Sequence, residues 1–261
     1  MRLDLDNSYL FHDIDKHGTI INGSKQMLVS DTTMLVRFEP DLDHIDSIIE
    51  KTKDDPNFPT PYVKQCIVGK NGKHTGLFFT TFVNFEGEKI YSVEYEWWQN
   101  PNWEQNKNPA EDEVKAVKVF VTPNETPSFD VVVNKRNGVI GLNVNGETAA
   151  EPYNCIIDYS QALMWMGVAN KLSQDLSVDF DHFACLYVGD ISLLHVQETP
   201  LTNEEVNLFF NSFDKFLDLK IDVRKNKVYV TTDFSQTTPY KVRDFSGNGL
   251  HPLLFNHEWI G

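Results

Sequence analysis

The sequence predicts an all-β fold, an antiparallel β-sandwich (jelly roll) with one amphipathic helix near residues 203–218. Two observations carry this prediction. Short segments in which apolar and polar residues alternate recur along the chain with turn signals between them, and only two segments have helical spacing. Strands that hardly ever alternate with helices are typical of antiparallel sandwiches and not of parallel sheets.

The clearest strand signal is a hairpin in the middle of the chain. Residues 128–134 and 139–145 each alternate apolar and polar side chains, and Asn137-Gly138 lies between them. Asn-Gly tolerates the positive φ angles of a type I′ turn, so the two segments are expected to pair. A second Asn-Gly, at 145–146, ends the return strand. Further strands are expected at residues 63–68, 76–85, 89–98, 114–121, 162–168, 182–195, 220–223 and 227–232.

A capping box begins the clear helix. Thr202 is placed to accept a hydrogen bond from the amide of Glu205, whose carboxylate reaches back. Apolar side chains then recur at helical spacing and form one stripe that predicts packing against a sheet: Val206, Phe209, Phe210, Phe213, Phe216 and Leu217. A shorter helix is expected at residues 43–53, where Pro56 follows as a stop.

The 261 residues fit one large all-β domain that spans residues 1–261. No shift in composition marks an internal boundary. Residues 1–25 are expected to form an N-terminal arm and residues 233–261 a C-terminal wrap. The polar stretch 99–112 is expected to be a long loop within the domain.

Composition excludes several classes of function. The 38 acidic and 23 basic residues give a net charge of −15, which argues against nucleic acid as a partner. No segment approaches the roughly 18 apolar residues of a membrane span. The acidic N-terminus lacks the basic flank of a signal peptide, so a secretory signal is not expected. The cysteines are expected to be reduced, mostly buried thiols because no Cys-x-x-Cys pair is present: Cys66, Cys155 and Cys185.

Four segments of the middle and later chain share motifs with a known superfamily. They are Gly-Leu-Asn-Val-Asn-Gly-Glu at 141–147, Leu-Met-Trp-Met-Gly at 163–167, the strand and capping box within 188–206, and Asp-Phe-Ser-Gly-Asn-Gly-Leu-His at 244–251. In this order they resemble the laminin-G-like and concanavalin-A-like jelly-roll superfamily. One departure is that the Ser-Gly-Asn-Gly signature follows the helix, whereas in the family it precedes the strands. The last segment is expected to complete the sandwich in a permuted order; the alternative is the start of a second, truncated unit.

The resemblance directs attention to one strand with alternating carboxylates. Some relatives are glucan hydrolases that use such carboxylates as nucleophile and acid/base. Here Glu94, Glu96 and Trp98 share a strand face, so a tryptophan stands where the third carboxylate is needed. A tryptophan beside carboxylates suits sugar binding, and Trp103 would extend the platform. The alternatives are an exposed charged strand face and, for Trp103, a loop anchor packed on the core.

Calcium is the one cofactor that the sequence suggests. Laminin-G-like domains often hold a calcium ion at the rim of the sandwich through aspartates and carbonyl groups. Asp179 and Asp181 would share a strand face and are the predicted metal ligands. The alternative is a solvated acidic rim without metal.

The expected function is that of a non-enzymatic binding or structural module that recognises a glycan or a protein partner. By analogy with phage fibres and decoration proteins, which resemble it in fold, it is expected on a virion or cell surface, and otherwise in the cytoplasm. The alternative is a glycoside hydrolase of the same fold that acts on a β-glucan. A third hypothesis is a homo-oligomeric assembly subunit whose extended ends clasp neighbours.

Overall fold

The structure is a computed structural model of the chain. It describes the following residues: 2–4, 9–12, 31–52, 62–69, 76–99, 113–124, 127–153, 165–166, 169–170, 183–184, 187, 189–219, 221, 228–233, 244–246, 252–255 and 258–260.

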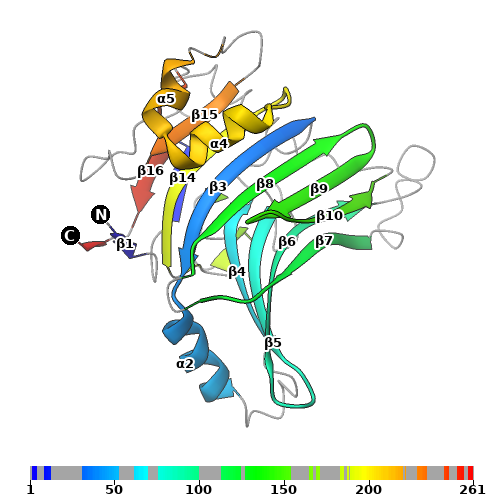
Figure 1. The fold of residues 1–261 in the computed structure, drawn as a ribbon. Helices are drawn as coiled ribbons and strands as arrows, with labels where there is room; N and C mark the ends of the chain where they lie inside the picture. The colour runs from blue at the N-terminus through cyan, green and yellow to red at the C-terminus, as the bar shows by residue number, and fades with distance from the viewer. Residues whose placement is uncertain are drawn as a thin grey trace.

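Two antiparallel sheets form the body of the molecule (Figure 1). In spatial order the six-stranded sheet contains β10 (Glu147–Pro152), β9 (Val139–Val144), β8 (Phe129–Arg136), β3 (Thr32–Pro40), β14 (Gly189–Gln197) and β15 (Val228–Asp233). The seven-stranded sheet contains β16 (Pro252–Phe255), β2 (Tyr9–His12), β11 (Trp165–Met166), β4 (Tyr62–Gly69), β5 (Gly76–Val83), β6 (Lys89–Gln99) and β7 (Glu113–Val121). The prediction of an all-β antiparallel sandwich is therefore confirmed.

Short strands from both ends of the chain pair with each other. β2 pairs with β16 within the seven-stranded sheet. Two further two-stranded ladders join β1 (Arg2–Asp4) to β17 (Glu258–Ile260) and β12 (Ala169–Asn170) to β13 (Phe183–Ala184). Residues of the predicted arm and of the predicted wrap thus lie in the same sheets.

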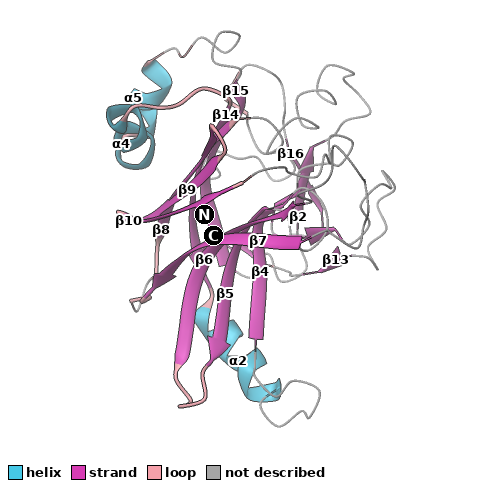
Figure 2. Cartoon of the chain, turned by 90° about the vertical axis from the view of Figure 1, so that its right-hand side faces the viewer, coloured by secondary structure: helices cyan, strands magenta, loops and turns pink. Residues whose placement is uncertain are grey.

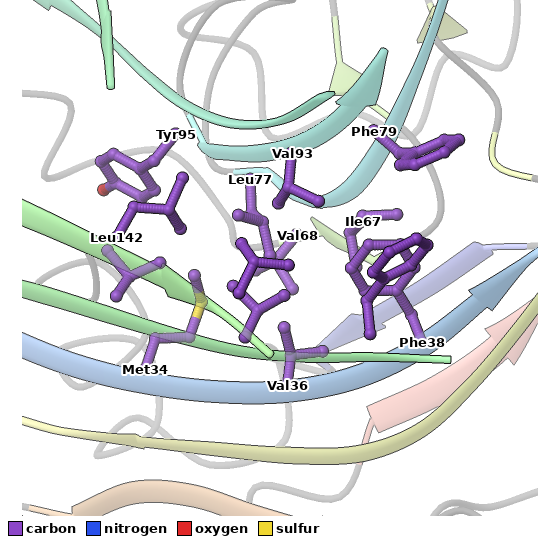
Figure 3. Close-up of a cluster of buried hydrophobic side chains, with 14 of the residues drawn as sticks. Met34, Val36, Phe38, Ile67, Val68, Leu77, Phe79, Val93, Tyr95 and Leu142 are labelled. Carbon is purple, nitrogen blue, oxygen red and sulfur yellow. The ribbon is translucent and has the colours of Figure 1, made fainter. Parts of the chain in front are cut away.

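The core fills the space between the two sheets (Figure 3). Val36 and Phe38 of β3 face Phe79, Val93 and Tyr95 of the opposite sheet, and all five side chains are buried. The rings of Phe38 and Phe79 meet edge to face, with their centroids 6.0 Å apart. Alternate residues of each strand point into this layer, as expected for face-to-face packing of two sheets.

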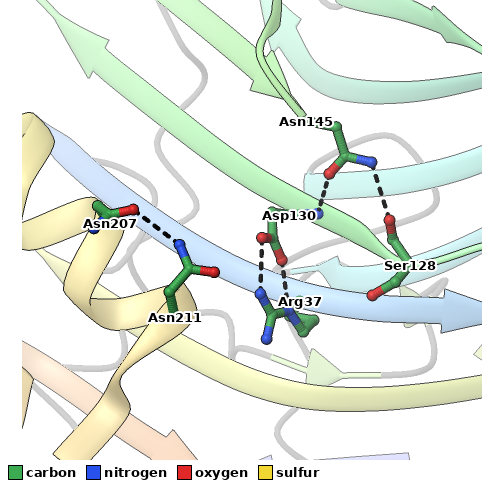
Figure 4. Close-up of polar contacts among 6 residues, drawn as sticks. All are labelled: Arg37, Ser128, Asp130, Asn145, Asn207 and Asn211. Atoms are coloured by element: carbon green, nitrogen blue, oxygen red, sulfur yellow. Dashed lines mark hydrogen bonds and ion pairs between the residues drawn. The ribbon is translucent and has the colours of Figure 1, made fainter.

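The second Asn-Gly turn ties three strands together (Figure 4). Asn145 and Gly146 have positive φ angles of 50° and 98°, which let β9 turn into β10. The Asn145 side chain donates to the carbonyl of Ser128 at 3.0 Å and accepts from the amide of Asp130 at 2.7 Å. The Asp130 carboxylate in turn accepts two hydrogen bonds from Arg37, at 2.6 and 2.8 Å. A residue of the quoted Asn-Gly motif thereby fixes the start of β8 against β3.

β14, which lies within the quoted segment 188–206, begins with a glycine that the pairing requires. Gly189 has a φ of +140°, and a Cβ at this position would collide with the carbonyl oxygen of Glu39. Only glycine therefore allows β14 to pair with β3 from Pro40 onward.

The predicted helix at 203–218 divides into two, α4 (Asn203–Asn211) and α5 (Phe213–Asp218). Ser212 lies between them with φ −158° and ψ 62°, which ends α4 and redirects the chain. The redirection brings the rings of Phe213 and Phe216 to 5.6 and 5.2 Å from that of Phe209. The capping box at Thr202 is confirmed by both of its hydrogen bonds.

These helices cover the outer face of the six-stranded sheet. Phe209, Phe210 and Phe216 pack against Leu35 and Leu193, as the apolar stripe predicts. Figure 2 shows α4 and α5 together beside this sheet, and α2 (Leu42–Thr52) at the other end of the molecule. The shorter helix expected at 43–53 is thus confirmed with small shifts of its ends.

Several strand predictions need correction. β3 and β10 were not expected, although β3 lies in the middle of its sheet. Of the strand expected at 162–168 only Trp165–Met166 is a described strand, and the one expected at 182–195 is divided into β13 and β14. Ile221 lies outside any strand, and the rest of 220–223 lies outside the described residues.

Candidate functional site

The candidate site is the face of the seven-stranded sheet that points away from the core. On this face of β4 to β7 a group of polar and charged side chains lies among apolar ones, and we call this group the charged face: Lys64, Thr80, Ser92, Glu94, Glu96 and Lys118. Glu94 pairs with Lys118 across β6 and β7, and with Phe78 across β5 and β6. The period-two prediction that Glu94, Glu96 and Trp98 share one face agrees with this register.

Glu94 lies beneath the surface and has three polar partners. It is 2% exposed. The hydroxyl groups of Thr80 and Ser92 lie 2.6 and 2.7 Å from Oε1, and Lys118 Nζ lies 2.9 Å from Oε2. Burial alone would raise the pKa of Glu94, but the hydrogen bonds from Thr80, Lys118 and Ser92 outweigh it and lower the pKa. Glu94 is therefore a fixed carboxylate at neutral pH.

Glu96 forms the second ion pair of the charged face. Its carboxylate accepts a short hydrogen bond from Lys64, and the two side chains are only 8% and 9% exposed. The Lys64 ammonium also lies 4.1 Å from the centroid of the Phe78 ring, a cation–π contact. Lys64 thus stands between a carboxylate and an aromatic face. These contacts hold both charges in place on the sheet.

The face is not the exposed charged strand that one alternative reading of the sequence expects. Both carboxylates are nearly excluded from solvent, while Lys118 is 47% exposed and Trp98 is half-buried. On this side of the sheet, solvent therefore reaches Lys118 and Trp98, and also Phe120, which is 64% exposed near the end of β7. The ion pair with Glu94 fixes the position of the Lys118 side chain at the surface.

The remaining predicted site residues lie outside the described part of the chain. Trp103 belongs to the stretch 100–112, and Asp179 and Asp181 belong to the stretch 171–182. Their roles in sugar and calcium binding stay predictions. Within the described residues no group of three or more His, Cys, Asp and Glu side chains is placed to hold a metal ion.

The sequence reasoning missed the two lysines of the site. Lys64 and Lys118 occupy polar positions within strands that the sequence predicts at 63–68 and 114–121. A lysine at a polar position on a strand beside an acidic strand indicates a cross-strand ion pair, as Lys118 of β7 forms with Glu94, whereas Lys64 of β4 reaches Glu96 across β5. The missing information was the strand order, which places β5 and β6 between β4 and β7.

Two hollows are lined by none of the six residues of the charged face. An open groove of about 790 Å³ lies near the start of β6 and the end of β7, and its walls include Phe82, Ile90 and Phe120. Its lysine, Lys89, forms an ion pair with Asp46 at 2.6 Å. The lining is mostly apolar, so the groove offers few groups that would orient a polar ligand.

The second hollow, of about 90 Å³, lies beneath α5 next to His195. The ring nitrogens of His195 lie 2.8 Å from Thr231 Oγ1 and 3.0 Å from Gln197 Oε1. Burial lowers the pKa of His195 to about 4, although the bond to Gln197 opposes the shift. The imidazole is therefore neutral and fully hydrogen-bonded, which is typical of a structural histidine.

The quoted C-terminal motif also has a structural role. Asp244 accepts hydrogen bonds from the amide of Thr231 at 3.1 Å and from the hydroxyl of Ser246 at 2.7 Å. The amide of Phe245 donates to the carbonyl of Thr231 at 2.7 Å. Asp244 is itself buried. The motif thus fastens its own segment beside β15.

Comparisons with known proteins give structural likenesses only. No protein-family model and no curated protein matches the chain. Domains LG4-5 of the mouse laminin alpha1 chain are similar to it with a TM-score of 0.37 and 10% identity over 75% of this chain. The chain spans 40% of the length of that laminin structure.

Two smaller structures are also similar. The CBM40 module of the Ruminococcus gnavus IT-sialidase, solved with α2,3-sialyllactose, has a TM-score of 0.39 and 12% identity, and the likeness covers 79% of this chain and 91% of the module. A toad ovary galectin in complex with thio-digalactose has a TM-score of 0.29 and 10% identity, over 56% of this chain and 90% of the galectin.

The helices in the described part of the chain are too short or too polar to span a membrane.

Proposed function

We propose that the protein is a non-enzymatic binding module and that its charged face recognises a glycan. The observation that supports this proposal is the fixed ion pair of Glu94 and Lys118, in which a half-exposed lysine side chain lies on the same sheet face as Trp98. An aromatic ring covers the apolar side of a pyranose, and a fixed donor bonds its hydroxyl groups. Glu94 already holds Lys118, and Glu96 already holds Lys64. The binding of a sugar would therefore cost little conformational entropy in these side chains.

In this proposal the predicted residues have different roles. Trp98 and Lys118 contact the sugar, and Trp103 extends the surface on which it lies. Glu94 and Glu96 are positioning residues, since each is buried and holds a lysine. Asp179 and Asp181 bind calcium at the rim of the sandwich. The module acts on a virion or cell surface.

The chemistry of the carboxylates argues against the glycoside hydrolase alternative. A retaining or inverting mechanism needs one carboxyl group that stays protonated in order to donate to the leaving oxygen. The pKa of Glu94 is lowered, and Glu96 is ion-paired with Lys64. Neither group is arranged as a general acid. Reducing-sugar release from a β-glucan that disappears in Glu94→Gln would nevertheless establish hydrolysis.

A glycan array probed with the labelled protein tests the proposal, with calcium and with a chelator. We expect binding to at least one glycan class, and at least a tenfold loss of affinity in Lys118→Met and in Trp98→Ala. Loss of binding in the chelator would support the calcium site. The matched control is Lys115→Met, because Lys115 lies on the same strand, points to the opposite face and pairs with Glu113 at 2.7 Å.

Two results would overturn the proposal. One is the absence of binding to any glycan with calcium present. The other is a glycan affinity that both Lys118→Met and Trp98→Ala leave unchanged, since the ligand would then lie elsewhere. Far-ultraviolet circular dichroism of each variant separates loss of the site from loss of the fold.

A further inference from the structure

The seven-stranded sheet ends at a long strand with an open edge. β7 pairs with β6 along its whole length, from Glu113 opposite Gln99 to Val121 opposite Tyr91. On its other side β7 has no hydrogen-bonded strand among the described residues, although β10 of the other sheet lies close to it. An unpaired edge presents a row of amide and carbonyl groups to any strand of matching length.

The nearby edge of the other sheet is protected, whereas β7 is not. β10 is six residues long, ends in a proline and carries the exposed carboxylates of Glu147 and Glu151. These features discourage pairing. β7 is nine residues long, contains no proline or glycine and is rich in valine. The two edges lie on the same side of the sandwich (Figure 1), so the difference does not come from their location.

The lysines of β7 do not protect its edge, because their charges have partners within the same molecule. Lys118 forms an ion pair with Glu94, and Lys115 forms one with Glu113. At the end of the strand Phe120 is 64% exposed. β7 thus combines an open backbone, neutralised charges and an aromatic side chain in solvent.

We infer that two copies of this chain associate through β7, antiparallel and edge to edge, so that the two seven-stranded sheets become continuous. The occupant of the edge is a second copy because the strand is complementary to itself. In such a pairing residues directly opposite each other share a sheet face, so each permitted register is centred on a residue of the strand.

The side chains favour the register centred on Val117. This register pairs all nine residues, places Phe120 opposite Val114 of the second copy and places Lys118 opposite the small Ala116. A register centred on Lys118 would set two ammonium groups against each other, and one centred on Ala116 would leave Phe120 beyond the end of the partner strand.

The Val117 register also continues the candidate site across the two copies. Val114 pairs with Trp98 on β6. Phe120 of the second copy would lie opposite Val114, so these three side chains would form one row across the two copies. The two charged faces would then form one surface with two sets of lysines related by a two-fold axis. A surface of this kind binds a repeating ligand more tightly than one copy does.

Measurement of the mass in solution over a range of concentrations tests the association. We expect a mass of twice 30.0 kDa that falls on dilution, and a dimer weakened at least tenfold by Phe120→Glu. The matched control is Phe85→Glu, because Phe85 is fully exposed in the turn between β5 and β6 and lies outside β7. This control is expected to keep the dimer. A strict monomer up to millimolar concentration, or a dimer that Phe120→Glu leaves unchanged, would overturn the inference.

Cysteine pairing tests the register itself. Under oxidation a mixture of Val114→Cys and Phe120→Cys chains should form a disulfide between copies, because the two positions face each other. Each variant alone should not, since its cysteine and that of the second copy would be about 20 Å apart, six residues along the strand. Wild-type protein under the same oxidation is the control for the natural cysteines. Equal cross-linking in the single variants, or none in the mixture, would overturn the register.

Discussion

On the six-stranded sheet, Leu35 and Leu193 point away from the core into a cluster of phenylalanine rings supplied by α4 and α5. On the seven-stranded sheet, the outward positions carry Lys64, Glu94 and Glu96, which satisfy one another through ion pairs and hydroxyl groups. Both outer faces are nearly excluded from solvent at these residues. At these residues one face therefore consists of packed apolar rings, and the other of buried charges that pair with one another.

The two outer faces contribute differently to the stability of the fold and to the placement of its side chains. Burial of apolar rings stabilises a fold roughly in proportion to the area removed from water. A buried ion pair contributes little net stability, because desolvation of the charges offsets their attraction, yet removal of one partner is costly. The helix-covered face thus accounts for stability, whereas the charged face fixes the positions of its lysines.

The largest expected effect is on the helix-covered face. Phe209 is fully buried, and its ring lies within 6 Å of those of His195, Phe210 and Phe216. Phe209→Ala should lower the free energy of unfolding by about 4 kcal/mol through lost contacts and a cavity. Urea unfolding measures this loss. Phe85→Ala, at a fully exposed ring, should change it by less than about 0.5 kcal/mol. A loss below about 1 kcal/mol for Phe209→Ala would contradict the docking of α4 and α5.

The next effect belongs to the charged face. Glu96→Gln removes one partner and leaves the Lys64 ammonium buried without its carboxylate. We expect a loss of about 3 kcal/mol in the free energy of unfolding. The double variant Lys64→Met with Glu96→Leu removes both charges and should recover most of the loss, since an apolar pair replaces the ion pair. Failure of the double variant to recover stability would show that this face is held by more than its charges.

The comparison also explains which strands the sequence reveals. The hairpin of β8 and β9 was predicted because each strand has an apolar inner side and a more polar outer side. β3 was missed because its first half is buried on both sides, with Met34 and Val36 in the core and Leu35 beneath α4 and α5, so that alternation is limited to the short stretch 36–39. β10 was missed for the opposite reason, since its exposed Glu147–Pro152 carries no hydrophobic pattern and follows only from the turn at Asn145.

For the candidate site, local alternation correctly placed Glu94, Glu96 and Trp98 on one face of β6. Alternation within one strand does not reveal what the neighbouring strands contribute. The partners Lys64 and Lys118 come from β4 and β7, two strands that long-range pairing brings to either side of β5 and β6. The ion pairs of the two carboxylates depend on this arrangement and were therefore not predictable from the strand alone.

A third effect is the pH dependence of the helix-covered face. The pKa of His195 is lowered to about 4, below the ordinary value of 6.5, because the imidazole is buried under Phe209 and Phe216. Between pH 6.5 and 4 the unfolded chain binds a proton that the folded chain does not, so stability falls as the pH drops through this window. Between pH 7 and pH 5 we expect a loss of about 2 kcal/mol from this histidine.

Urea unfolding of the wild type and of His195→Gln at the two pH values measures this contribution. The variant should lose most of the pH dependence, because glutamine does not titrate. The measurement stops at pH 5 because the lowered pKa of Glu94 places its own contribution below that range. A wild-type stability that is equal at pH 7 and pH 5 would mean that the helices do not keep His195 from water.

The smallest effect concerns how α4 begins and not what it covers. The Thr202 hydroxyl accepts from the amide of Glu205 at 3.2 Å, and the Glu205 carboxylate accepts from the amide of Thr202 at 2.7 Å. Thr202→Ala should lower the free energy of unfolding by about 1 kcal/mol, because one helix amide loses its acceptor. Ser212→Ala is the control, since Ser212 makes no side-chain cap to α5, and it should cost only a few tenths of a kcal/mol. If Thr202→Ala costs as much as Phe209→Ala, the cap and not the ring packing holds the helices on the sheet.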